Sequence, residues 1–147
     1  MSDYKHILVA IDFTRQTERI TARALSLAGQ YQATLYLLHV VETLPVTDAA
    51  YGPVAPFDID LTEQMQTAAQ QHLADWGKKI QIPTERQWLE LGSPKQEIVR
   101  IATARNIDLI VVGSHGRHGL SLLLGSTATG VLHHAPCDVL AVRIREQ

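Results

Sequence analysis

Three groups of residues in this sequence could bind a charged small molecule: an aspartate, a glycine-rich segment and two hydroxyl residues. Asp12 directly follows an apolar run, and the segment 113–127 carries four glycines ahead of its hydroxyl pair, Ser126 and Thr127. Glycines let the backbone approach a ligand closely, and the N–H groups at a helix N-terminus favour phosphate. The Asp12 carboxylate could accept a hydrogen bond from a ribose hydroxyl or an adenine amino group. The pattern therefore favours a nucleotide lying between the two segments.

Each of these features also has a purely structural explanation. Glycines after a strand often only turn the chain, a Ser-Thr pair commonly caps a helix, and Asp12 could be a turn or cap residue. Other chemistries have weaker support, because no lysine follows the last glycine as a P-loop requires and no Gly-x-Ser-x-Gly elbow occurs. His133 and His134 are adjacent on an expected helix and point about 100° apart. We therefore expect no catalytic residue and no dedicated metal site, apart from Mg²⁺ arriving with a triphosphate.

Alternating strands and helices must position these residues. Apolar runs with many β-branched residues at 7–11 and 109–113 predict fully buried strands. Further strands are expected at 35–41, 84–91 and 139–142. A first helix is expected after a Thr14 cap. A second begins with a capping box at Asp60 and Glu63, and its apolar stripe is Leu61, Met65, Ala69, Leu73 and Trp76. A third runs from Ser93-Pro94 to about Asn106, and a fourth from about Ser126 to before Pro136. This alternation predicts one α/β domain over residues 1–147, with a parallel sheet covered by helices on both faces.

The composition of the chain argues against several further classes of protein. The chain has 13 basic and 15 acidic residues, a net charge of -2, which argues against binding nucleic acid through phosphate neutralisation. The single cysteine excludes an intramolecular disulfide, and no apolar run approaches the length of a membrane span. A soluble, cytoplasmic protein is therefore expected. The stretch 42–57 has three prolines and little periodicity, so it is interpreted as an irregular insert that could order over a bound ligand.

Several motifs together resemble the universal stress protein family over essentially the whole chain. They are 5–12 (KHILVAID), 37–40 (LLHV), 92–94 (GSP), 108–116 (DLIVVGSHG), 124–127 (LGST) and 135–142 (APCDVLAV). The resemblance implies a flavodoxin-like α/β fold, with a five-stranded parallel sheet in the order 3-2-1-4-5. Family members with the spacing Gly, two residues, Gly, nine residues, Gly and then Ser or Thr bind ATP. In this sequence the long gap, residues 117–124, is eight residues, one fewer than in that pattern.

The same resemblance implies a binding site and an assembly. The expected nucleotide-binding residues are Ala10, Asp12, Val40, Gly113, Gly116, Arg117, Gly125, Ser126 and Thr127. The ligand would be ATP, or AMP in its place. A homodimer is expected through the last strand, residues Val139, Leu140, Ala141 and Val142, although the C-terminal tail could shield that edge instead.

The function that follows is an ATP-binding regulatory protein of the stress response, which changes its surface for a protein partner that the sequence does not identify. Two alternatives remain. One is a family member that binds no nucleotide and acts only as an interaction module. The other is a slow ATPase or self-phosphorylating protein, for which no positioned general base is found.

Overall fold

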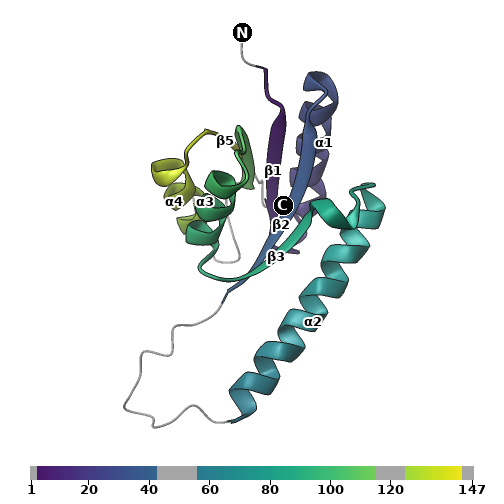
Figure 1. Ribbon diagram of the computed structural model, residues 1–147, viewed down its shortest axis with the longest axis vertical. Helices are drawn as coiled ribbons and strands as arrows, with labels where there is room; N and C mark the ends of the chain where they lie inside the picture. Colours follow the sequence, from purple (N-terminus) through teal and green to yellow (C-terminus); the bar gives the residue numbers. More distant parts are fainter. Residues whose placement is uncertain (1–2, 43–55, 115–124, 144–147) are drawn as a thin grey trace.

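The computed structural model describes residues 3–42, 56–114 and 125–143. It has five strands and four α-helices that alternate along the chain (Figure 1). In order they are β1 (His6–Ile11), α1 (Thr17–Tyr31), β2 (Thr34–Glu42), α2 (Pro56–Lys79), β3 (Gln87–Gly92), α3 (Pro94–Ala104), β4 (Leu109–Gly113), α4 (Ser126–His134) and β5 (Asp138–Val142), with a 3-10 turn at Thr84–Arg86 before β3. None of the helices within these ranges is both long enough and apolar enough to cross a membrane.

The five strands form one parallel sheet in the order β3-β2-β1-β4-β5. This confirms the predicted flavodoxin-like α/β fold and its strand order. All strands point the same way, so the sheet has an amino end, where the strands begin, and a carboxyl end, where they finish. β1 connects through α1 to β2 on one side, whereas β4 lies on its other side, so the winding direction reverses between β1 and β4.

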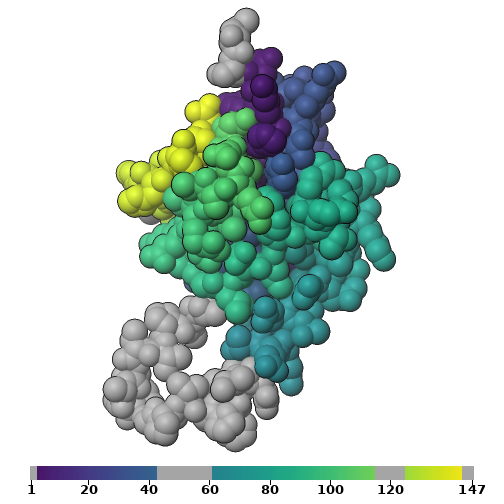
Figure 2. All heavy atoms as spheres, in the orientation of Figure 1, coloured from purple at the N-terminus to yellow at the C-terminus, as the bar shows by residue number. Residues whose placement is uncertain are grey.

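Two hydrophobic cores lie on opposite faces of the sheet. Ile7, Val9 and Ile11 of β1 pack in the core that includes α1 and α2, and Leu8 packs in the core that includes α3 and α4. Because β1 and β4 are buried on both faces, continuous apolar runs are what these two strands need. Figure 2 shows the atoms of α3 (green) and α4 (yellow) as one continuous surface over their face of the sheet.

Two predicted helix starts need correction, and a third is confirmed in position. Thr14 does not cap α1, because the N-cap is Gln16 and the Thr14 hydroxyl instead accepts a hydrogen bond from the Gln16 N–H. The start of α2 predicted at Asp60 was wrong, because the helix begins at Pro56, a residue suited to the first turn. Ser93 does occupy the N-cap of α3 as predicted, but its hydroxyl makes no capping bond.

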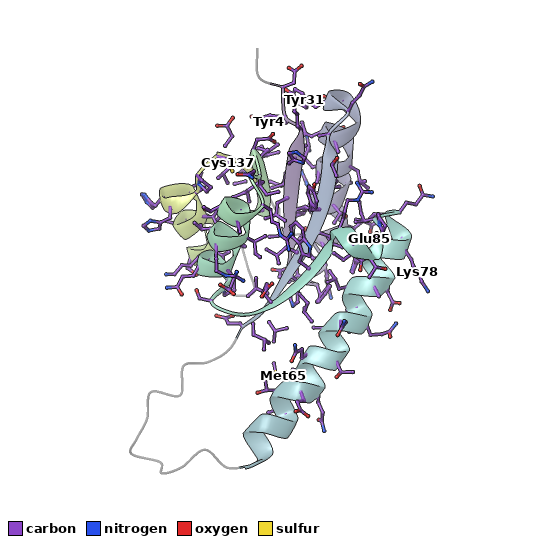
Figure 3. All side chains as sticks on the ribbon, in the orientation of Figure 1. Tyr4, Tyr31, Met65, Lys78, Glu85 and Cys137 are labelled. Atoms are coloured by element: carbon purple, nitrogen blue, oxygen red, sulfur yellow. The ribbon has the colours of Figure 1, made fainter. Side chains whose placement is uncertain are left out.

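The predicted stripe of α2 is only partly buried. Ala69 and Leu73 lie in the core, whereas Leu61 and Met65 are 55% and 46% exposed. The helix continues past the sheet, and Met65 lies on this projecting part (Figures 1 and 3). β3 begins at Gln87 rather than at 84, because the preceding residues form the 3-10 turn. Of the irregular insert predicted at 42–57, residues 43–55 lie outside the described residues.

Side chains form several hydrogen bonds at the amino end of the sheet. The Asp108 carboxylate accepts hydrogen bonds from the backbone N–H groups of Lys5 (2.9 Å) and His6 (3.0 Å). The Tyr4 hydroxyl donates to Asp138 (2.7 Å), and this bond raises the pKa of Tyr4 to about 12. Burial raises the pKa of the Cys137 thiol to about 11, with further contributions from Asp108 and Asp138. Figure 3 shows Tyr4, Tyr31 and Cys137 together at this end.

Candidate functional site

The candidate site lies at the carboxyl end of the sheet, where β1 and β4 finish side by side. Asp12 follows the last residue of β1, and Gly113 is the last residue of β4. The two strands pair directly, so the fold brings together two sequence segments that are about a hundred residues apart. This is the position at which open parallel sheets bind ligands.

Asp12 holds the turn that leaves β1. Its Oδ1 atom accepts hydrogen bonds from the Thr14 hydroxyl (2.8 Å) and the Thr14 N–H (3.2 Å). This is an Asx turn, so the structural explanation given above for Asp12 is correct for one carboxylate oxygen. Within the described ranges, no hydrogen bond reaches its other oxygen, Oδ2. Asp12 can therefore fix the turn and still offer an acceptor to a ligand.

Phe13 has an unusual backbone conformation that the sequence did not reveal. Its φ is 60°, in the left-handed region that bulky side chains rarely adopt. Its ring packs against His39 of β2 (4.1 Å between centroids) and His72 of α2 (5.3 Å). The Nδ1 atom of His39 donates to the Ile11 carbonyl (2.6 Å). Ring packing therefore holds a strained turn next to Asp12, as often occurs at binding sites.

The two ends of the glycine-rich segment are held together by backbone hydrogen bonds. The Ser114 N–H donates to the Val142 carbonyl (2.8 Å), and the Gly125 N–H donates to the Ser114 carbonyl (2.7 Å). Gly113 and Gly125 therefore lie near one another. Gly116 and Arg117 were predicted to bind phosphate, but they lie outside the described residues.

No side chain of the described residues caps the N-terminus of α4. Gly125 is the N-cap, and it has no side chain that could form a capping bond. The first intrahelical bond runs from the Thr129 N–H to the Gly125 carbonyl, so the N–H groups of Ser126, Thr127 and Ala128 have no partner inside the helix. These three donors, with two hydroxyl side chains, form an arrangement suited to an anion.

Ala10 and Val40 lie beside this region on neighbouring strands. The β1–β2 pairing ends at Ile11↔His39, so Val40 lies one residue beyond the last position that β1 covers. Both side chains pack in the core with α3 and α4, and Val40 is buried. Any ligand contact by Val40 would therefore use its backbone. Among the described residues, no group of three or more His, Cys, Asp or Glu side chains is placed to hold a metal ion.

Comparison with known proteins identifies the family. Residues 3–143 match the universal stress protein family. The chain is 42% identical over 145 residues to universal stress protein A homolog 1 from Coxiella burnetii, with 97% of this chain and 99% of the relative covered. Universal stress protein UspA from Lactobacillus plantarum shares the structure with a TM-score of 0.80 at 27% identity, over 99% of this chain and 100% of that chain. A universal stress protein in complex with cAMP shares the fold, with a TM-score of 0.65 at 23% identity over 96% and 98% of the two chains. This chain belongs to the universal stress protein family.

Proposed function

We propose that this universal stress protein binds an adenine nucleotide, ATP or AMP, and acts as a regulatory protein through that ligand. One observation carries the proposal: Asp12 and the N-terminus of α4, which no described side chain caps, lie at the end of the sheet where β1 and β4 finish. The first supplies a hydrogen-bond acceptor, and the second supplies N–H donors in a region of partial positive charge. A nucleoside phosphate needs both kinds of group.

Each residue of the proposed site has a role. Asp12 accepts from the ribose or the adenine amino group, and the backbone near Ala10 and Val40 contacts the adenosine. Gly113, Gly125, Ser126 and Thr127 hold the phosphates, together with Gly116 and Arg117 of the glycine-rich segment. Mg²⁺ accompanies a bound triphosphate. That the same fold holds cAMP in another universal stress protein supports an adenine ligand.

The experiment measures bound and added nucleotide. Purified protein is denatured and the supernatant is analysed for ATP and AMP by mass spectrometry, followed by calorimetric titration with Mg-ATP and with AMP. We expect the wild type to bind, and both Asp12→Ala and Gly125→Val to lose most of the affinity. Thr14→Val is the matched control, because it removes the hydroxyl that bonds to Asp12 Oδ1 but keeps the carboxylate.

The control separates binding from turn stability. If Thr14→Val lost as much affinity as Asp12→Ala, the carboxylate would act only through the turn. A wild-type protein that neither carries nor binds adenine nucleotides would contradict the proposal and favour the alternative of an interaction module without ligand. Phosphate release measured in the same samples tests slow hydrolysis.

We further propose that the protein forms a homodimer through β5. This strand is at the sheet edge, and its residues Val139, Leu140 and Ala141 are half-buried apolar side chains. Exposed edge strands need a cover or a partner, and antiparallel pairing of β5 with its copy about a two-fold axis would provide one. Light scattering after gel filtration should give twice the chain mass, and Leu140→Lys should give a folded monomer.

We also propose a cytoplasmic location, because the one cysteine, Cys137, is free, as is usual in a reducing compartment.

A further inference from the structure

Lys95 lies against α4, the helix whose N-terminus belongs to the proposed phosphate site. It is the second residue of α3, and α3 and α4 lie side by side (Figure 1). Its hydrocarbon stem runs over Gly130 of α4, so that a Cβ atom added to Gly130 would lie 2.7 Å from Lys95 Cδ and 3.0 Å from Lys95 Cβ. Glycine at position 130 therefore provides the space in which this stem lies on α4.

Gly130 is one helical turn from the uncapped end of α4. Residues three and four positions earlier on a helix share its face, and here those residues are Thr127 and Ser126. Long side chains on a helix also point toward its N-terminus, which for Lys95 means toward the carboxyl end of the sheet. The stem thus lies one turn from the three N–H groups that have no partner inside the helix.

The Lys95 ammonium is one of several cations in the described part of the chain without a side-chain partner, whereas three others are engaged. Arg100 pairs with Glu90 (3.2 Å) and Glu97 (2.9 Å). Arg105 lies over the Trp88 ring, and Lys79 lies over Trp76. Lys95 makes no hydrogen bond or ion pair among the described residues. Its charge is therefore available to a ligand.

We propose that Lys95 contacts the outer phosphates of the bound nucleotide and makes the site prefer ATP to AMP and adenosine. This inference rests on the proposed function and adds a selectivity residue to it. An ammonium is a mobile point charge that suits phosphate oxygens, and its effect grows with the negative charge of the ligand. Adenosine has no phosphate, so its affinity should not depend on Lys95.

The test is calorimetric titration of the full chain with Mg-ATP, AMP and adenosine. Lys95→Gln should weaken ATP binding about tenfold, weaken AMP less and leave adenosine unchanged. Lys95→Arg keeps the charge and should retain most of the ATP affinity. Arg15→Gln is the matched control, because Arg15 is another exposed cation at the carboxyl end but precedes α1, on the opposite face of the sheet.

A second variant tests the contact with α4. Gly130→Ala places a methyl group against the Lys95 stem and should also weaken ATP more than adenosine. In a Lys95→Gln background, Gly130→Ala should cause little further loss of ATP affinity, because the charge is already absent.

The outcomes distinguish this inference from the proposed function. A wild type that binds none of the three ligands overturns both. A wild type that binds, with the same ratio of ATP to adenosine affinity in Lys95→Gln, overturns only the role of Lys95. An equal loss of ATP affinity in Arg15→Gln would show that the effect comes from the overall charge at the carboxyl end of the sheet. That result would also overturn the role of Lys95.

Discussion

At the amino end of the sheet, side chains accept hydrogen bonds from free backbone donors, whereas at the carboxyl end no described side chain caps the donors of α4. Asp108 accepts from two backbone N–H groups, and Tyr4 bonds to Asp138. At the other end Gly125 is an N-cap without a capping side chain, and Phe13 holds a strained turn. The difference indicates that the amino end contributes to folding stability, whereas the polar groups of the carboxyl end are those that we propose bind a ligand.

The largest expected contrast is in the reactivity of a thiol at each end. Burial raises the pKa of Cys137 to about 11, so at pH 8 it should carry about a hundredfold less thiolate than an ordinary cysteine. Ser126→Cys, made together with Cys137→Ser, puts the only thiol at the exposed start of α4, where a helix N-terminus favours the thiolate. Iodoacetamide should modify it much faster than the native Cys137. Equal rates would remove the contrast, and denatured samples give the unprotected reference rates.

The next largest effect is on stability, from the amino end. Asp108→Ala leaves the Lys5 and His6 N–H groups without their acceptor, and should lower the free energy of unfolding by about 2 kcal/mol. Asp108→Asn keeps one acceptor oxygen and should cost about half as much. Urea unfolding measures both, and nucleotide affinity should be unchanged. A large loss of affinity in Asp108→Ala would show that the two ends are not independent.

A smaller, stabilising effect is expected where α1 ends. Gln32 is the C-cap of α1 and has a φ of 54°, a conformation that glycine adopts without steric cost. Gln32→Gly should therefore raise the free energy of unfolding by up to about 1 kcal/mol. Gln32→Ala removes the same side chain without relieving the backbone, so it serves as the control. Thermal melts that rank alanine above glycine would contradict this explanation.

The smallest effect comes from Tyr4 and depends on pH. The hydrogen bond to Asp138 raises the pKa of Tyr4 from 10.0 to about 12, so the folded state holds this proton more tightly than the unfolded state. The bond should stabilise the protein below pH 10, and its contribution should disappear as the pH rises to 12. Because Tyr4 is near the surface, Tyr4→Phe should cost only about 0.5 kcal/mol at pH 7. Wild type and variant should converge in urea titrations at alkaline pH, and a constant difference would contradict the assignment.

Much of the fold could be predicted because a strand that is buried on both faces has a continuous apolar run in the sequence. The run at 109–113 matches β4, and Ser93-Pro94 and Ser126 mark the starts of α3 and α4. The start of α2 was missed because Pro56 is one of three prolines in a stretch without periodicity. The exposure of Leu61 and Met65 was also missed, since a stripe shows which face of a helix is apolar but not where the sheet beneath it ends.

The candidate site was predicted in part. Asp12 and Gly125 could be chosen because residue type and position after a strand are visible in the sequence. Two features depend on tertiary contacts, so no local sequence pattern predicts them. They are the left-handed conformation of Phe13 and the hydrogen bond between Gly125 and Ser114. Gly116 and Arg117 stay predictions, because they lie outside the residues that the structure describes.

The bond between the Gly125 N–H and the Ser114 carbonyl has a consequence for protein engineering. It joins the residues on either side of the stretch 115–124, and because closure entropy changes only slowly with length, we expect a change in the number of residues between them to leave both anchors in place. We expect that segments of different lengths could be exchanged among relatives at this point, and chimaeras would test whether this segment affects nucleotide affinity.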